Sequence, residues 1–250
     1  MSPRTVRLRT ALAAEWIKLT SVRSTIGALA AVGVMLPVLA AVVGLTGSLQ
    51  PDDTVIGASL TGGAPAQIAA GVVGVLVIGG EYGSGTLRAT LAARPDRGTV
   101  LAAKAVVVGG LTFVAAVAGA AVAAGVGRAL ITGHPSGAVV PGVLGAAAAI
   151  TAVGLLGTGL GVLLRHTAGA VLAVAAAVLL PQLLAPLAGS WRGWVAGAGP
   201  VAVLQKLAQS SDADPSVVGG LGPVASLAVL TGYAMAALLV AGVVFRRRDA

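Results

Sequence analysis

The chain has 250 residues, of which 57% are hydrophobic and 10% charged, with a net charge of +8 and no cysteine. So few charges cannot cover the surface of a water-soluble domain of this size, and the lack of cysteine excludes disulfides and thiolate metal sites. Several apolar stretches reach the roughly 20 residues that a helix needs to cross a bilayer, and they lack the polar alternation of a β-barrel. The sequence therefore predicts an all-α integral membrane protein.

A basic segment precedes the first apolar stretch. Residues 6–23 are predicted to form a helix on the membrane surface, because at 100° per residue several apolar side chains share one side. Arg7, Lys18 and Ser21 are expected to point away from that side. A simple basic leader that only sets the topology is the alternative. The residues assigned to this interfacial helix are Leu8, Leu12, Trp16, Lys18, Leu19 and Arg23.

Six membrane spans are predicted. Pro37 is expected to kink the first span, and Gly62, Gly63 and Pro65 to weaken the outer half of the second. The predicted spans are Thr25–Leu45, Leu60–Gly80, Thr99–Val126 with Lys104 near one end, Val139–Leu164, Thr167–Gly189 and Leu221–Phe245.

A glycine-rich, charged segment, "GEYGSGTLRATLAARPDRG" (80–98), separates the second and third spans. Its glycines are expected to end the second span, Ser84 or Thr86 to cap a short new helix, and Thr99 to cap the third span. Such a helix is too small to form its own core, so it is predicted to be a docking site for another protein; an ordinary solvated loop is the alternative. The residues assigned to this coupling helix are Glu81, Tyr82, Gly83, Gly85, Thr86, Leu87, Arg88 and Leu91.

Motifs for catalysis are missing from the sequence. The start of the same segment approaches the phosphate-binding pattern G-x-x-x-x-G-K-[ST] but lacks its lysine. The two histidines, His134 and His166, fall on opposite sides of the predicted membrane and cannot form a metal pair. No predicted span contains an acidic residue in its interior, which argues against a proton pump built on buried carboxylates. The chain is therefore expected to be no enzyme, with no metal or cofactor of its own.

Small residues are frequent in the spans. Gly157 and Gly161 in the fourth span form a small-xxx-small pair, which lets helices approach closely in lipid. Packing within the chain and a face for a second copy are both compatible with this pair. The loop Ser190–Gly220 on the other side carries Trp191, Trp194 and Pro200; it is predicted either to dip back into the membrane as short helices or to use its tryptophans as interface anchors.

The charge distribution predicts the orientation. Lys and Arg concentrate before the first span, between the second and third, and after the sixth, all on one side of the membrane. The opposite side has only Arg128, Arg192 and Lys206 together with acidic residues at 52, 53, 212 and 214. Because basic residues mark cytoplasmic loops, both termini are predicted to be cytoplasmic. The positive charge is thus a topology signal, and nucleic-acid binding is not expected.

The N-terminal "EWIKLTSVRST", the "GEYGSGTLRATLAARPDRGTVLAAK" after the second span, the six spans and the terminal "FRRRDA" resemble permease subunits of the bacterial ABC-2 type exporter family. The resemblance covers nearly the whole chain, although Pro65 and two glycines interrupt the second span. It implies a single permease domain over 1–250, with a cytoplasmic helix at 1–24, a six-span bundle at 25–245 and a basic tail at 246–250.

The resemblance also implies partners and a location. A separate ATPase subunit, which binds ATP and Mg, would grip the coupling helix at 81–91 and the N-terminal helix at 8–23. A second permease copy would complete the transporter, as a homodimer or a heterodimer, in the bacterial cell membrane. The substrate is expected to be hydrophobic or amphipathic. An ion-coupled secondary carrier and a non-transporting anchor of a sensor or assembly complex are the alternatives.

Overall fold

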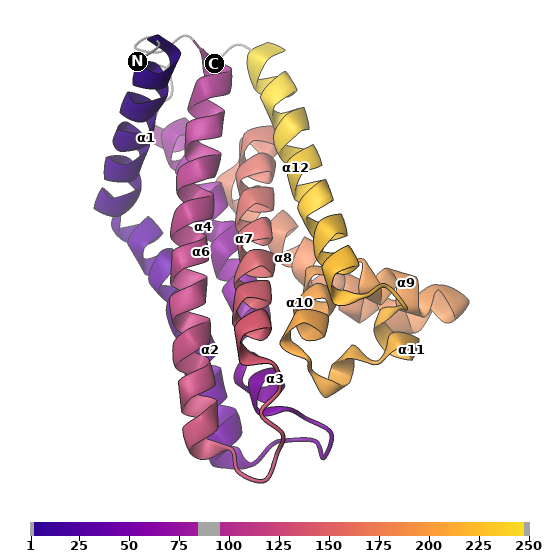
Figure 1. Cartoon of the computed structure of the whole chain (residues 1–250). Helices are drawn as coiled ribbons and strands as arrows, with labels where there is room; N and C mark the ends of the chain where they lie inside the picture. The colour runs from indigo at the N-terminus through magenta and orange to yellow at the C-terminus, as the bar shows by residue number, and fades with distance from the viewer. Residues whose placement is uncertain (1–2, 85–95, 248–250) are drawn as a thin grey trace.

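Within the part of the chain that the structure describes, six helices are long and apolar enough to cross a membrane, which agrees with the predicted all-α fold. The computed structural model describes residues 3–84 and 96–247, with side chains described over 10–82 and 96–247. Both termini lie at the same end of the bundle (Figure 1). The spanning helices are α2 (Arg23–Thr46), α4 (Gly63–Ser84), α6 (Arg97–Leu130), α7 (Val139–Leu164), α8 (Thr167–Leu184) and α12 (Pro223–Arg247).

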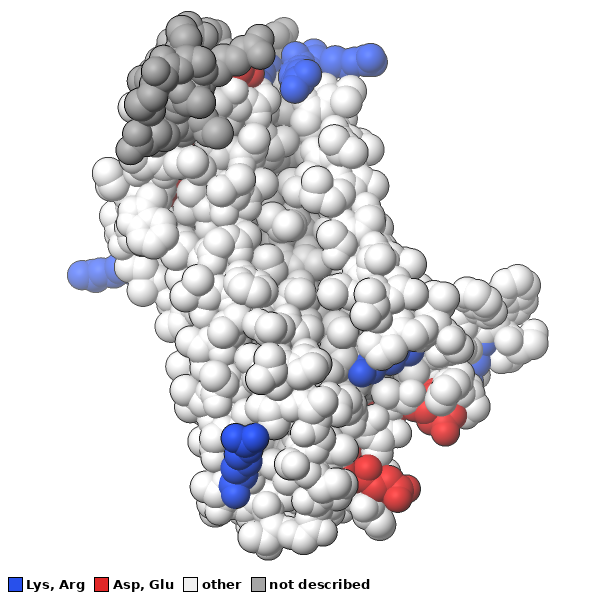
Figure 2. Space-filling view, in the orientation of Figure 1, with Lys and Arg blue, Asp and Glu red and all other residues white. Residues whose placement is uncertain are grey.

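The surface of the bundle is apolar. Figure 2 shows a face on which charged side chains are sparse and most of the area is uncharged. Large hydrophobic side chains such as Val114, Leu172 and Leu239 are about two-thirds exposed, which suits contact with lipid tails. The structure therefore supports a multi-pass membrane protein.

The predicted helix boundaries hold best where the sequence has clear end signals. The fourth span occupies Val139–Leu164 as expected. The second is shifted: a separate short helix, α3 (Val55–Ser59), is capped by the Thr54 side chain, and α4 begins only at Gly63. Gly83 does not end α4, which continues to Ser84. The fifth span was predicted to reach Gly189, but α8 ends at Leu184 and the chain continues as a 3-10 helix, η1 (Ala185–Trp191).

The core lies where α4 crosses α7. These two helices are the most buried of the spans. Gly71 and Gly74 on α4 face Gly157 and Gly154 on α7, and a Cβ on Gly74 or on Gly157 would collide with the backbone of the other helix. Gly161 likewise lies against Val75 of α4. The small residues of α7 therefore serve packing within the chain.

The loop between the fifth and sixth spans forms four short elements. These are α9 (Arg192–Gly197), α10 (Pro200–Ala208), η2 (Ser211–Ala213) and α11 (Pro215–Val218). Pro200 starts α10, which packs against α7, α8 and α12, while α9 and α11 extend to one side of the bundle (Figure 1). Trp191 and Trp194 are about two-thirds exposed. The segment that enters the bundle is therefore α10, and the tryptophans stay on the outside.

A buried lysine fastens α10 to the sixth span. Lys206 Nζ donates hydrogen bonds to the Leu221 carbonyl oxygen at 2.9 Å and to Ser226 Oγ at 3.2 Å. Burial lowers the pKa of Lys206, because it disfavours the charged form. On the other side, Gln67 Nε2 donates to the Pro200 carbonyl oxygen at 2.9 Å, so α4 also holds the start of α10.

Asp96, and not Thr99, caps α6, and its removal should weaken that helix. Its carboxylate accepts hydrogen bonds from the Gly98 and Thr99 amides and from Thr99 Oγ1. Asp96→Ala should cost about 1 kcal/mol of unfolding free energy, as a lost N-cap does. Hydrogen bonds from Thr99 lower the pKa of Asp96 below its ordinary 3.8.

The capping role of Asp96 can be tested by measuring the free energy of unfolding at different pH values. The pKa of Asp96 is lower in the folded protein than in the unfolded chain, where it is 3.8. The ionised carboxylate therefore contributes its full stabilisation above pH 3.8, and this stabilisation is lost as the pH falls through the folded-state pKa. The difference in unfolding free energy between wild type and Asp96→Ala should therefore be constant near neutral pH and shrink below about pH 4. A difference that persists unchanged at pH 2 would contradict this assignment of the cap.

Candidate functional site

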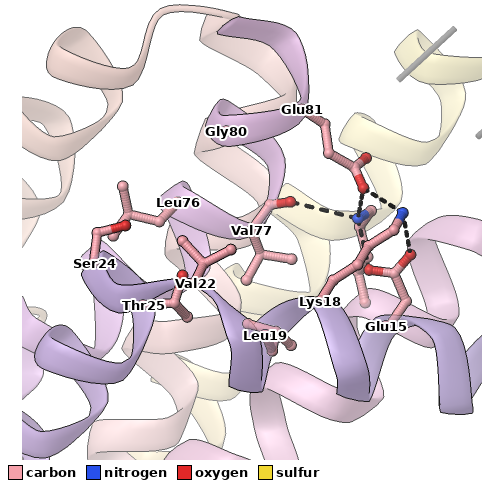
Figure 3. Close-up of a pocket in the computed structure, with 11 residues that line it drawn as sticks. Glu15, Lys18, Leu19, Val22, Ser24, Thr25, Leu76, Val77, Gly80 and Glu81 are labelled. Atoms are coloured by element: carbon pink, nitrogen blue, oxygen red, sulfur yellow. Dashed lines mark hydrogen bonds and ion pairs between the residues drawn. The ribbon is translucent and has the colours of Figure 1, made fainter. Parts of the chain in front are cut away.

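Four charged side chains from three helices meet at the end of the bundle that holds the termini. Glu15 and Lys18 come from α1 (Pro3–Ser21), Glu81 from the last turn of α4 and Lys104 from α6. Lys104 Nζ lies 2.7 Å from Glu15 Oε2 and 2.9 Å from Glu81 Oε1. Lys18 Nζ lies 2.8 Å from Glu81 Oε1 and 3.4 Å from Glu15 Oε1. Each cation thus bridges both carboxylates (Figure 3), and we call these residues the charge cluster.

The charge cluster is buried but electrically balanced. Lys104 has no exposed surface, and Glu15 and Glu81 are 4% and 7% exposed. Removing such charges from water is costly unless opposite charges and hydrogen bonds compensate. Two cations balance two anions here, and α1 supplies one of each. The ion pairs therefore hold α1 against α4 and α6.

Lys18 is the member of the charge cluster that reaches solvent, since 43% of its side chain is exposed. Burial lowers the pKa of its ammonium group, but the hydrogen bond to Glu81 and the charges of Glu15 and Glu81 outweigh burial and raise it. Lys18 is therefore positively charged throughout the physiological pH range, and it covers the side of the cluster that faces solvent.

A cavity of about 420 Å³ adjoins the charge cluster. It lies in the angle between α1, α2 and α4, where the chain bends at Val22 (Figure 3). Apart from the cluster, its walls are mainly apolar, including Leu19, Val22, Leu76 and Val77. The cavity leaves space beside the ion pairs that Glu15 and Lys18 of α1 make with α4 and α6.

Further contacts fasten both flanks of segment 85–95. Before it, the Arg165 guanidinium, at the turn between α7 and α8, lies 5.4 Å from the centroid of the Tyr82 ring. After it, Arg97 Nη1 donates to the Phe245 carbonyl oxygen at 2.8 Å, and its guanidinium lies 5.9 Å from the Phe245 ring centroid. The charge cluster and these two contacts connect the flanks to α1, α6, α7, α8 and α12.

The predicted coupling helix is only partly described. Glu81 and Tyr82 lie in α4 and contact other spans, and Gly83 continues the same helix. The remaining residues assigned to the coupling helix, Gly85, Thr86, Leu87, Arg88 and Leu91, lie outside the described residues.

The N-terminal helix is present as α1, and part of it packs on the bundle. Leu12 and Leu19, predicted to lie on the side that faces the membrane, pack against other helices. Trp16 of the same predicted side is 52% exposed, and Glu15 is buried. Lys18, predicted to point away from that side, binds Glu81. Arg23 begins α2 and is exposed, and the Leu8 side chain lies outside the described ones. α1 runs beside α6, and its position relative to a membrane surface stays a prediction.

Sequence reasoning missed Glu15 and the partnership of Lys104. The amphipathic pattern of the N-terminal helix treats Glu15 as one more polar residue. Lys104 was predicted only as a charge near one end of the third span, with no partner. The available signal was Glu81, which is the one charged residue of α4, together with Lys104 inside α6, since such charges need partners when buried.

The site offers no metal centre among the described residues, which include no group of three metal-ligating side chains. His166 instead caps α8, its Nδ1 accepting from the Gly169 amide at 2.9 Å. No protein-family model matches the chain, and no curated protein is significantly similar to it.

Proposed function

We propose that this chain is the membrane-spanning subunit of an ATP-driven exporter of the ABC-2 type. In this proposal a separate ATPase subunit binds ATP and Mg and pushes on segment 85–95 from the cytoplasm. The chain itself performs no chemistry and works with a second permease copy in the cell membrane of a bacterium. The resemblance of the sequence motifs supports this assignment, as does the concentration of Lys and Arg at the end that holds the termini.

The observation that carries the proposal is the attachment of both flanks of segment 85–95. Glu81 before it is bound to α1 and α6, and Arg97 after it is bound to α12. A displacement of this segment would therefore move several spans together and not one loop. A ligand or partner can drive such a change only through contacts that differ between two states, which ATP binding and hydrolysis in the partner would supply.

The test is co-purification followed by reconstitution with the ATPase. The chain alone should hydrolyse no ATP, and the reconstituted pair should show substrate-stimulated hydrolysis. Leu87→Asp together with Leu91→Asp should lower coupled hydrolysis at least tenfold, because a charged face would not dock on the partner. The matched control is Leu221→Asp in an exposed loop at the opposite end, which should leave coupling unchanged. Unchanged transport in the Leu87/Leu91 variant would refute the coupling role.

An ion-coupled carrier is the second candidate, because the buried Glu15, Glu81 and Lys104 are ionisable groups inside a membrane bundle. It predicts transport by the chain alone, driven by a proton or sodium gradient across proteoliposomes. A non-transporting anchor predicts neither gradient-driven transport nor substrate-stimulated ATP hydrolysis. The same reconstitution therefore separates the three functions.

A further inference from the structure

An apolar groove runs along the outside of the bundle between α6 and α12. Its volume is about 610 Å³, and its floor includes Leu155 of α7. The wall on α6 has a row of small residues flanked by two larger ones, and the wall on α12 has larger residues and an arginine. The α6 row is Gly98, Ala102, Ala105 and Gly109, flanked by Leu101 and Val106; the α12 wall includes Met235, Leu239, Gly242 and Arg246.

The sequence explains why the groove is there. One row on each wall repeats at spacings of four, three and four residues, which places each row on one side of its helix. The α6 row, from Gly98 to Gly109, has no side chain larger than a methyl group and leaves space beside α12. Leu101 bounds that space, since its Cδ2 lies 3.6 Å from a Cβ built on Gly242.

The positively charged side chain of Arg246 lies at one end of the groove. Arg246 lies over Gly98, so that a Cβ added to that glycine would come within 2.7 Å of Arg246 Nη2. The nearby Asp96 carboxylate is occupied by its three hydrogen bonds at the start of α6. The Arg246 charge contributes to the lowered pKa of Asp96, but among the described residues Arg246 takes part in no ion pair within bonding distance. Its exposed guanidinium is therefore able to bind an anion.

The length of the groove matches one membrane leaflet. Gly109 lies eleven positions after Gly98, which corresponds to about 16 Å along a helix, roughly half of the ~30 Å hydrocarbon core. An apolar channel of this depth that ends at a cation, on the side of the termini, is complementary to one acyl chain joined to a negatively charged head group.

We propose that the groove between α6 and α12 is a binding site for an anionic phospholipid from the leaflet next to the termini. The acyl chain lies on Ala102, Ala105 and Leu155, and the phosphate binds Arg246. Bidentate recognition of phosphate is a contact for which guanidinium is well suited. The proposal is independent of the exporter function, since it concerns a lipid of the surrounding membrane.

The test is native mass spectrometry of the full chain released from bilayers with equal amounts of phosphatidylglycerol and phosphatidylcholine. Wild type should retain phosphatidylglycerol about fivefold over phosphatidylcholine, the preference expected of one basic residue at the membrane surface. Arg246→Gln should abolish that preference. Ala102→Trp should lower the number of retained lipids of either kind by filling the groove, and since Ala102 is exposed the ring meets no core side chain.

Matched controls separate this site from general lipid contact. Arg247→Gln removes a neighbouring exposed charge, and Val114→Trp adds a ring on α6 away from the groove; both should behave as wild type. Equal retention of both lipids by wild type, an equal effect of Arg247→Gln, or unchanged retention in both Ala102→Trp and the smaller Ala102→Leu would overturn the proposal. So would disulfide-linked dimers of Ala102→Cys, because a second copy would then occupy the groove; the chain has no other cysteine.

Discussion

Lys104→Met should lower the free energy of unfolding by about 3–5 kcal/mol, the range found when one partner of a buried ion pair is removed. Lys104 Nζ is fully buried and contacts Glu15 Oε2 at 2.7 Å and Glu81 Oε1 at 2.9 Å. Without it, two buried carboxylates share the single charge of Lys18. The measurement is equilibrium unfolding in mixed micelles with increasing SDS.

Two controls show whether charge imbalance is the cause. Lys104→Met combined with Glu81→Gln leaves one cation and one anion, Lys18 and Glu15, and should be more stable than Lys104→Met alone. Arg128→Met makes the same kind of change on α6 at an exposed position and should stay within about 0.5 kcal/mol of wild type. A loss below about 1 kcal/mol for Lys104→Met, or no recovery in the double variant, would show that the charge cluster does not hold α1.

Gly157→Leu should destabilise the protein by about 3 kcal/mol or more, at the upper end of the range for overpacking. Any Cβ on Gly157 would collide with the Gly71 carbonyl oxygen, which belongs to the backbone of α4 and cannot rotate away as a side chain can. The two helices would have to separate along their whole crossing, and α4 and α7 are the most buried spans. The same unfolding assay measures the effect.

Gly110→Leu is the matched control for this substitution. Gly110 lies inside α6, and nothing lies within 4 Å of a Cβ built on it, so the added side chain would project into lipid. This variant should be neutral or slightly stabilising, because leucine has a higher helix propensity than glycine. Similar losses for Gly157→Leu and Gly110→Leu would mean that glycine matters for helix flexibility and not for the close approach of α4 and α7.

The cavity at the bend between α1 and α2 leaves room for the angle between these helices to change, and the charge cluster lies beside it. α1 makes its charged contacts through Glu15 and Lys18 on one side of that cavity, and α2 leaves it on the other. A shift of Glu81 toward or away from Lys18 would change the angle between the two helices. In the proposed exporter, this is the route by which a push on segment 85–95 would reach the first span.

The sequence by itself determined the number of spans and most of their ends. Runs of apolar residues as long as a bilayer is thick can satisfy their backbone hydrogen bonds in lipid only as helices, so length and composition were sufficient. The separation of the fourth and fifth spans at Arg165 and His166 was visible as a local signal. The helix at residues 3–21 was also predictable, since its period of apolar residues is local information.

Only the tertiary structure decided which side of each helix faces the protein and which faces lipid. In lipid both sides are apolar, so hydrophobic periodicity carries little information about packing. On α1, for example, only the packing shows that Glu15 is buried while Trp16 is 52% exposed. The positions of charged partners depend on helices far apart in the chain, such as Glu15 and Lys104. The packing of Gly157 against Gly71 of α4 could also be seen only in the tertiary structure. A small residue lets another helix come close, but the sequence does not say which helix that is.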